Sequence, residues 1–230
     1  MYYAVTLEFD KETEGKIQWM IDEVARVTGC DYMKRQNVPP HVTVSGLVGE
    51  NEEALLSEME EIAATMSKTL IRFVNIGVFN PLVIYLGPLV NEFLLETCKL
   101  VNERLLQYAE VGNKGNYLPN HWVPHAGIAV KLTPEALKEA FAIVQEKFTP
   151  FEGMVERIVL ARAEPYEELK AWELNGLNKK FMIGLILKRG TKRTPLRFYF
   201  IFSKIFLATW TPLAEACDRE WVMPLPSPMI

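Results

Sequence analysis

Two segments in which a histidine follows a proline and opens an alternating stretch constrain the fold of this chain most. They read Pro40-His41-Val42-Thr43-Val44 and Pro124-His125-Ala126-Gly127-Ile128. Alternation with a period of two is typical of a half-buried strand. Residues i and i+2 of a strand face the same way, so His41 and Thr43 are expected on one face while the valines between them enter a core. An amphipathic helix follows each segment, which predicts two similar halves.

The other periodicities predict the helices and strands around these segments. The expected order is strand–helix–strand–helix–strand–strand, then helix–strand–helix–strand and a short final strand. Asp10 is expected to cap the first helix and Gly29 to end it, and Thr133-Pro134 is expected to begin the last one. The expected strands are Tyr2–Phe9, His41–Val48, Leu70–Phe79, Leu82–Leu86, Val123–Val130, Phe151–Ala161 and Ala171–Leu174, and the third and fourth of them are expected to form a hairpin through Asn80-Pro81. The expected helices carry the apolar positions from Ile17 to Val27, Leu55 to Met66, Leu94 to Tyr108 and Leu137 to Val144. A loop is expected over Val111–Trp122.

Charge divides the chain into two parts. Of its 230 residues, 49% are hydrophobic and 23% are charged, which is typical of a folded protein. Residues 1–178 hold 16 Lys/Arg against 26 Asp/Glu, whereas residues 179–230 hold 9 against 3. We therefore predict one domain over residues 1–178 and a basic, apolar extension of unknown role over residues 179–230. The acidic body argues against non-specific binding to a DNA duplex, which needs a basic face.

The extension contains two apolar runs, Phe181–Leu187 and Phe198–Trp210. Each is shorter than the roughly 20 residues that a membrane span needs. A β-hairpin around Lys188–Pro195, or a cover lying on the body, is the simpler interpretation. The basic residues around the runs leave contact with a membrane surface, or recruitment to a partner, as the alternative.

Cysteine usage and the first residues suggest a cytoplasmic protein. Cys30, Cys98 and Cys217 form no CxxC pair, so a disulfide framework is not expected. The opening stretch MYYAVTLEFD lacks a basic segment followed by a long apolar one, so no signal peptide is predicted there.

An imidazole and a hydroxyl in one cleft suit a phosphate group. The Thr43 hydroxyl can donate to a non-bridging oxygen, and the His41 imidazole, whose pKa is ordinarily near neutrality, can give or take a proton. In-line cleavage of a phosphodiester needs both proton transfers, on opposite sides of phosphorus, and His125 on a second strand supplies the partner. A lone histidine on a strand is more often structural, but the second Pro-His segment favours a catalytic pair that needs no metal.

With these two segments the chain resembles the 2H phosphoesterase superfamily, specifically its 2′-5′ RNA ligase-like and cyclic phosphodiesterase proteins. That family is marked by two His-x-Thr/Ser-x motifs on strands. The first is intact here as His41-Val42-Thr43-Val44, and the second is His125-Ala126-Gly127-Ile128, 84 residues later. The resemblance covers about residues 1–174.

The resemblance implies an α+β fold with two lobes, in which two antiparallel sheets form a central cleft and the helices lie outside. It also implies a metal-independent phosphoesterase that acts, without a cofactor, on 2′,3′-cyclic phosphates or on 2′-5′ phosphodiester ends of RNA or nucleotides. His41 and His125 would act as general acid and base, and Thr43 would hold the phosphate.

Gly127 departs from the family pattern, because Thr or Ser is expected there. The absence of that hydroxyl would remove a charge-assisted hydrogen bond to the phosphate, worth roughly 1.5–3 kcal/mol. A water molecule or the Gly127 backbone N–H could substitute, since glycine lets a ligand approach the backbone closely. The alternative is a non-catalytic protein that binds a nucleotide or an RNA end through a degenerate second motif.

His121 lies four residues before His125, the spacing of a zinc pair on a helix. Pro124 lies between them, a strand-like alternation follows, and no glutamate occupies the His-Glu-x-x-His position. The sequence therefore predicts no metal site. Tyr117 and Trp122, in the loop before the second motif, could stack on a base or pack the loop.

Overall fold

The computed structural model describes residues 1–79, 82–163 and 165–176. The predicted domain boundary at residue 178, and both apolar runs of the extension, lie outside the described residues. The strands are β1 (Tyr2–Phe9), β2 (His41–Val48), β3 (Thr69–Phe79), β4 (Val83–Pro88), β5 (Glu110–Val111), β6 (Ala126–Ala129), β7 (Phe151–Ala163) and β8 (Tyr166–Glu173). The helices are α1 (Lys11–Thr28), α2 (Tyr32–Gln36), α3 (Glu52–Thr65), α4 (Glu92–Leu105), α5 (Pro134–Lys147) and the short 3-10 helix η1 (Asn113–Gly115).

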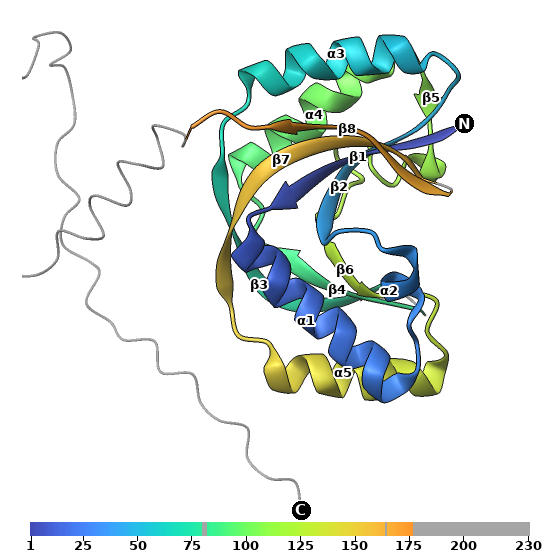
Figure 1. Cartoon of the computed structure of the whole chain (residues 1–230), viewed down its shortest axis with the longest axis vertical. Coiled ribbons are helices and arrows are strands. Elements are labelled where there is room, and N and C mark those ends of the chain that lie inside the picture. Colours follow the sequence, from blue (N-terminus) through green and yellow to red (C-terminus); the bar gives the residue numbers. More distant parts are fainter. Residues whose placement is uncertain (80–81, 164, 177–230) are drawn as a thin grey trace, which may run out of the picture. The chain divides into compact units, whose positions relative to one another are not determined.

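The strands form one antiparallel sheet in the order β5-β2-β1-β7-β3-β4-β6, with β8 paired to β7. The α+β class is confirmed, and the two expected sheets are the two halves of this continuous sheet. β2 and β6 lie far apart in the strand order, yet they contact each other although no ladder of the described strands joins them. The sheet is therefore strongly curved, and its curvature brings the two Pro-His strands together (Figure 1).

Strand β7 joins the halves. One of its edges pairs with β1, while its other edge is divided: residues 151–155 pair with β3, and residues 157–163 pair with β8. Thirteen residues in an extended conformation span roughly 43 Å, enough to serve both halves. A register shift between Glu8 and Phe9 marks a bulge where the partners of β7 change, and bulges increase strand twist.

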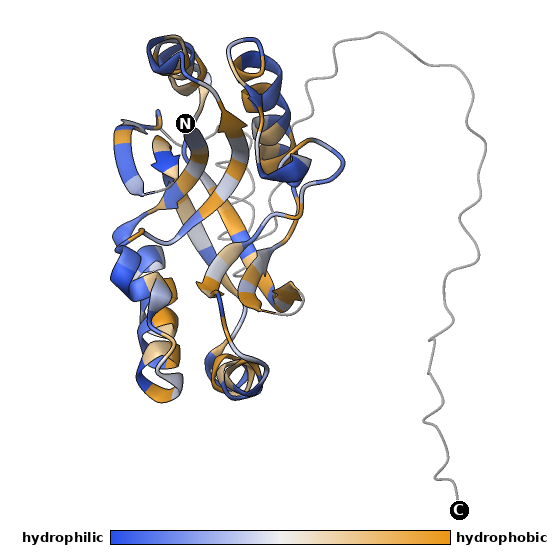
Figure 2. Ribbon diagram, turned by 90° about the vertical axis from the view of Figure 1, so that its right-hand side faces the viewer, coloured by the Kyte–Doolittle hydropathy of each residue, from blue (hydrophilic) through white to orange (hydrophobic). Residues whose placement is uncertain are grey.

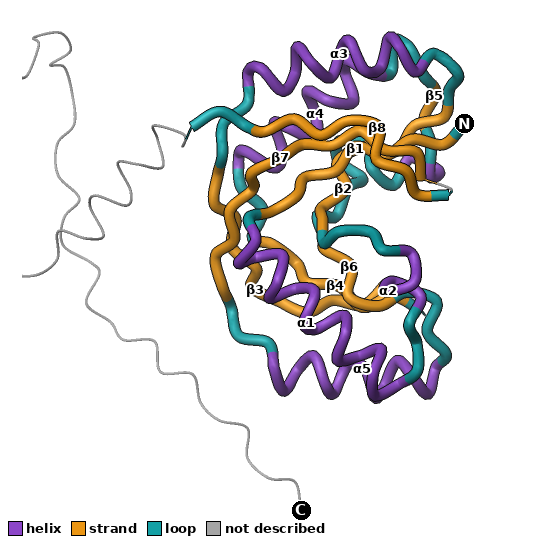
Figure 3. Tube along the Cα trace, viewed as in Figure 1, coloured by secondary structure: helices purple, strands orange, loops and turns teal. Residues whose placement is uncertain are grey.

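Each half is covered by its own pair of helices. Helices α3 and α4 contact each other and lie on β2, β7 and β8, whereas α1 and α5 contact each other and lie on β1, β4, β6 and β7. The helices form the outer layer (Figure 3), and hydrophobic and hydrophilic stripes run along them (Figure 2). The apolar stripes are buried against the sheet, as shown by Ile17 and Val24 of α1 and Leu55 and Met59 of α3, all 0% exposed. Within the described residues, no helix is long and apolar enough to cross a membrane.

The predicted helix boundaries are confirmed by their caps. The Asp10 side chain accepts a hydrogen bond of 2.8 Å from the Thr13 N–H at the start of α1, and Gly29 ends that helix with a left-handed φ of 70°. The Thr133 hydroxyl accepts from the Ala136 N–H at the start of α5. These side chains satisfy backbone groups that a helix end otherwise leaves without partners.

Several elements differ from the sequence-based expectation. The β3–β4 hairpin is confirmed by its ladder, while its expected turn residues Asn80 and Pro81 lie outside the described residues. Helix α2 and strand β5 were not predicted, because five and two residues are too few for a periodic pattern. Strand β8 begins at Tyr166, earlier than expected, because its acidic residues are exposed on an edge strand and give no apolar alternation.

Asn102 of α4 connects the helix layer to β2. It is 3% exposed. Its Nδ2 group donates to the carbonyl oxygens of Val44 at 3.1 Å and Tyr117 at 3.1 Å, and its Oδ1 accepts from the Ser45 hydroxyl at 2.9 Å. One buried amide therefore holds α4, β2 and the loop before β6 in a single network, and buried polar networks are costly when they lose a member.

We expect Asn102→Leu to lower the free energy of unfolding by about 2–4 kcal/mol, because it leaves several buried polar groups without partners. Urea unfolding followed by circular dichroism measures this. The neighbouring Glu103→Gln, in an exposed ion pair with Lys99, is the control and should change stability by less than about 0.5 kcal/mol. Equal midpoints for the two variants would contradict the structural role of Asn102.

Candidate active site

The first Pro-His strand presents His41 and Thr43 on one face of β2. In the β1–β2 ladder, His41 lies opposite Glu8 and Thr43 lies opposite Thr6. Val42 points to the other face and is 0% exposed. Thr43 is 8% exposed and His41 is half-buried. The imidazole and the hydroxyl are therefore neighbours on a partly covered surface.

A β-bulge ends this pattern directly after Thr43. The register of the ladder shifts between Val5 and Thr6, which leaves Val44 as the extra residue of β2. Ser45 is consequently turned to the face that α4 covers, where its hydroxyl donates to Asn102. The bulge thus separates the residues that face the site from the residue that anchors the strand.

His125 lies at the entrance to β6, on the other half of the sheet. It immediately precedes Ala126, which is 0% exposed. Gly127 lies opposite Tyr85 of β4 in the β4–β6 ladder. His125 and Gly127 share a face because they are two positions apart in an extended segment. His125 is half-buried and Gly127 is also partly accessible.

The two imidazoles are held in the same way. His41 Nδ1 lies 2.7 Å from the Pro39 carbonyl oxygen, and His125 Nδ1 lies 2.7 Å from the Val123 carbonyl oxygen. A carbonyl only accepts, so we assign the proton to Nδ1 in both neutral rings, which leaves each Nε2 with a lone pair. In both motifs the accepting residue precedes a proline, which restricts that residue to an extended conformation and fixes the direction of its carbonyl.

Burial is the main influence on both imidazoles, and it lowers the pKa of His41 and the pKa of His125 from the ordinary value of 6.5. The hydrogen bonds to Pro39 and Val123 act in the opposite direction. A positive charge on His125 further lowers the pKa of His41. The two rings are therefore close enough for a positive charge on His125 to disfavour a positive charge on His41.

Next to His41 on the sheet lies a buried carboxyl group. Glu8 is 2% exposed and forms an ion pair with Arg157 of β7. Burial raises the pKa of Glu8, and the nearby Arg157 guanidinium opposes that rise. A buried carboxylate needs such a partner, so Arg157 compensates the one acidic side chain that faces His41 across the ladder.

Aromatic rings surround His125. Its ring centroid lies 4.8 Å from Phe79 and 5.4 Å from Tyr85, both in edge contacts, and 6.3 Å from Tyr117 in a nearly parallel arrangement with an interplanar angle of 20°. Gly77 makes room for this packing, because a Cβ atom there would overlap the Tyr85 ring. These contacts hold the imidazole in place. Neither Phe79 nor Tyr85 was a candidate from the sequence.

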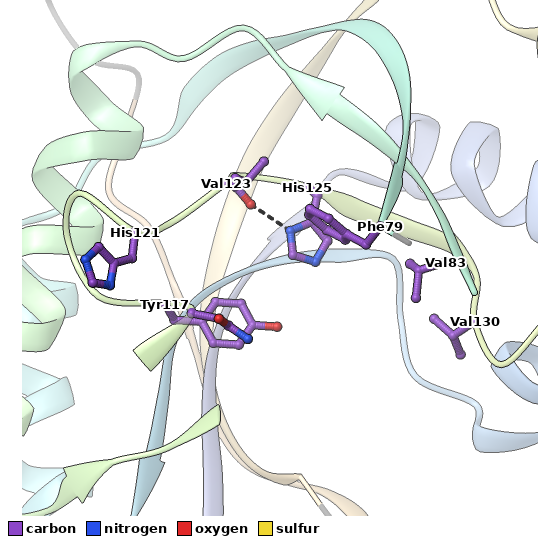
Figure 4. A pocket seen from close by; sticks show the side chains of 8 residues that line it. Phe79, Val83, Tyr117, His121, Val123, His125 and Val130 are labelled. Carbon is purple, nitrogen blue, oxygen red and sulfur yellow. Dashed lines mark hydrogen bonds between the residues drawn. The ribbon is translucent and has the colours of Figure 1, made fainter. Parts of the chain in front are cut away.

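A cavity of about 530 Å³ opens beside His125 (Figure 4). Its volume is within the ordinary range for small-molecule sites. Most of its wall is apolar, and the polar contributions come from the histidines, Tyr117 and Asn116. The lining residues are Phe79, Val83, Asn116, Tyr117, His121, Val123, His125 and Val130.

The loop between η1 and β6 is fastened to the first motif. The Trp122 indole N–H donates to the Thr43 carbonyl oxygen at 2.9 Å, and Asn102 holds the Tyr117 carbonyl oxygen. Burial raises the pKa of the Tyr117 phenol, and the nearby side chain of Thr43 acts in the opposite direction. Gly46 permits this approach, since a Cβ there would lie 3.1 Å from the Tyr117 ring. Trp122 thus packs the loop, and Tyr117 reaches both motifs.

Comparison with known proteins places the chain in a family. The sequence model of the 2′-5′ RNA ligase superfamily matches residues 16–167. The chain belongs to this superfamily. Among solved structures, TT0787 of Thermus thermophilus is 18% identical, with a TM-score of 0.51 over 77% of this chain and 100% of the other. Escherichia coli LigT complexed with 3′-AMP is 15% identical, with a TM-score of 0.51 over 75% and 97%.

At these identities the two structures show a shared fold alone. No curated protein matches the chain. Members of the superfamily are phosphoesterases and RNA ligases, and both motifs of this chain lie within the matched residues.

The site of this superfamily member is open at Gly127, where the resemblance leads us to expect a hydroxyl. A Cβ atom at this position would meet only the Met33 methyl group, at an ordinary contact distance of 3.6 Å. Gly127 has no positive φ, so a side chain would not strain the backbone there. The missing hydroxyl is thus a property of the sequence and is not enforced by packing.

His121 is exposed and lies in the wall of the cavity. In the part of the chain that the structure describes, no group of three or more His, Cys, Asp or Glu side chains is arranged to hold a metal ion. His121 and His125 are joined by an irregular segment rather than by a helix, so their spacing of four does not place them on one helical face.

We expect His41 and His125 both to titrate below pH 6.5, with the proton of each neutral ring on Nδ1. Two-dimensional ¹H–¹⁵N spectra of the imidazoles, recorded against pH, measure both properties. The protein in denaturant is the control and should give values of about 6.5. A lowered pKa means that protonation favours unfolding, so the contribution of these rings to stability is lost as pH falls. Titration above 6.5 would contradict the burial of the rings.

Proposed function

We propose that this chain is a metal-independent phosphoesterase that acts on 2′,3′-cyclic phosphates or 2′-5′ phosphodiester ends of RNA or nucleotides. The observation that supports it most is the matched pair of imidazoles. Each has Nδ1 bound to a backbone carbonyl and a free Nε2, and a positive charge on His125 adds to the lowering of the His41 pKa that burial causes. Two such groups, one protonated and one neutral, are what general acid–base catalysis at a single phosphorus atom needs.

In the proposed hydrolysis, the Nε2 atom of one histidine takes a proton from water while the water oxygen attacks phosphorus. The bond from phosphorus to the ribose oxygen breaks, and the Nε2 atom of the other histidine gives that oxygen its proton. The product is a phosphomonoester. In ligation, the hydroxyl of a second RNA end attacks the cyclic phosphate in place of water, and the two histidines keep the same roles. Cleavage of the new phosphodiester is the reverse of ligation and exchanges those roles, as microscopic reversibility requires.

Thr43 is proposed to hold the phosphate, because its hydroxyl lies on the same face of β2 as His41. The backbone N–H of Gly127 is proposed as a contact on the other side, since no side chain shields it. The cavity beside His125 has room for one nucleoside. Its mostly apolar wall favours the flat face of a base over a second phosphate.

We expect His41→Ala and His125→Ala each to lower kcat for a 2′,3′-cyclic nucleotide by about 10²–10⁴-fold, the usual contribution of a general acid or base. Chromatographic detection of the 2′- or 3′-monophosphate measures this, with thermal melts to show that the variants fold. Lys99→Ala, on the exposed face of α4, is the control. A chelator should leave the rate of the parent unchanged.

The same experiment tests the alternative of a non-catalytic binding protein, which Gly127 suggests. Tight binding of the cyclic nucleotide without product, or a parent rate equal to that of His41→Ala, would contradict the proposed hydrolysis and support the binding protein.

We expect kcat/KM to be highest below about pH 6.5 and to fall as the pH rises. The free enzyme is active when one imidazole is protonated and the other is neutral. Because both pKa values are lowered from 6.5, this form is most populated between two values that both lie below 6.5. Initial rates at low substrate concentration, measured from about pH 4.5 to about pH 8.5 with overlapping buffers, give the profile. A maximum above pH 7 would contradict this assignment.

A further inference from the structure

The proposed function leaves one chemical requirement unmet. Of the two hydroxyl groups that the family motifs place on the phosphate, only that of Thr43 is present, because residue 127 is glycine. A charged phosphate oxygen without a donor binds less tightly. Another hydroxyl close to His125 would meet this requirement.

The Tyr117 side chain lies between the two motifs. Its ring is nearly parallel to the imidazole of His125, with 6.3 Å between centroids, and Figure 4 shows the two rings side by side. Thr43 of the first motif lies close enough to influence the pKa of the Tyr117 phenol, which burial raises and Thr43 lowers. A hydroxyl that borders both motifs is within reach of a phosphate that Thr43 holds.

Two contacts hold the Tyr117 backbone, and Gly46 leaves room for its ring. The buried amide of Asn102 holds the Tyr117 carbonyl oxygen at 3.1 Å, and the Cys98 thiol lies 3.5 Å from the same oxygen. The absent side chain of Gly46 leaves space for the ring on β2. A rigid tyrosine loses little entropy when it binds a ligand, since its hydroxyl is already in place.

Resting on the proposed function, we infer that the Tyr117 hydroxyl binds the substrate phosphate and takes the place of the hydroxyl missing at Gly127. Tyr117 is then a substrate-binding residue of this site. It comes from the loop before the second motif, whereas the family pattern places a hydroxyl within that motif. The phenol remains protonated throughout and donates one hydrogen bond to a non-bridging oxygen.

The decisive experiment is a double-mutant cycle between Tyr117→Phe and Gly127→Thr. Tyr117→Phe keeps the ring against His125 and removes only the hydroxyl, so kcat/KM for a 2′,3′-cyclic nucleotide should fall roughly 10- to 150-fold, the range for a charge-assisted hydrogen bond. Gly127→Thr restores a hydroxyl at the family position, where there is room for it. In that background, Tyr117→Phe should cost less than about threefold, because the two hydroxyls serve one purpose.

Three further measurements exclude a merely structural role. Tyr108→Phe, which removes an exposed hydroxyl outside the site, is the matched control and should leave kcat/KM within about twofold. The pH profile of Tyr117→Phe should show a lower kcat/KM at every pH with the same apparent pKa values. Disturbed packing on His125 would instead shift those apparent pKa values. In a Thr43→Ala background, Tyr117→Phe should still lower kcat/KM; no loss there would show that Tyr117 acts only by orienting Thr43, and would overturn the inference.

Failure of this inference can be told apart from failure of the proposed function. If the parent is active and His41→Ala is not, but Tyr117→Phe equals the parent, the phosphate contact is wrong and the hydrolysis stands. If Tyr117→Phe lowers kcat/KM as much in the Gly127→Thr background as in the parent, the inference that the Tyr117 hydroxyl replaces the missing one is wrong. Binding of 3′-AMP by calorimetry needs no turnover: a weaker affinity in Tyr117→Phe supports the contact, and an equal affinity contradicts it.

Discussion

The hydrogen bond from Nδ1 of each histidine to the carbonyl of the residue two positions earlier is the constraint on which the site depends. An imidazole on a strand can otherwise rotate and can carry its proton on either nitrogen. Pro40 and Pro124 hold the preceding residues extended, so both carbonyls accept at 2.7 Å. Both rings then offer the same atom, Nε2, to a ligand. The burial that accompanies this arrangement lowers both pKa values, which favours the neutral form of each ring.

Two strands that begin far apart in sequence, with their histidines 84 positions apart, can cooperate only if the sheet brings them together. The length of β7 makes this possible, because its 13 residues pair with β1 along one edge and with β3 and β8 along the other. The resulting curvature lets β2 contact β6. Asn102 then joins the β2 backbone to the loop that leads to β6. The geometry of the candidate site thus depends on one long strand and one buried amide, neither of which touches the proposed substrate.

The sequence predicted the features that depend on local pattern. The main strands and helices, the caps at Asp10 and Thr133, and the left-handed Gly29 follow from periodicity and from backbone chemistry. The continuity of the sheet through β7 could not be predicted, since alternation shows which residues face a core but not which strands pair. Phe79, Tyr85 and Asn102 were missed for a similar reason: a buried aromatic ring or amide looks the same in a sequence whether it packs a core or supports a site. The roles of His41, Thr43, His125 and Gly127 stay predictions.

A missing motif residue does not by itself indicate a lost activity. A motif records which residue usually provides a group, whereas the reaction requires only that a donor lie within reach of the phosphate. At Gly127 the side-chain donor is absent, but there is open space at that position, and the Tyr117 side chain lies near Thr43 and against His125. Because Met33 alone borders the open space at Gly127, packing has not closed the site around the loss. A degenerate binding protein has no need of two imidazoles held by the same backbone contact, and the match between them therefore favours the proposed enzyme.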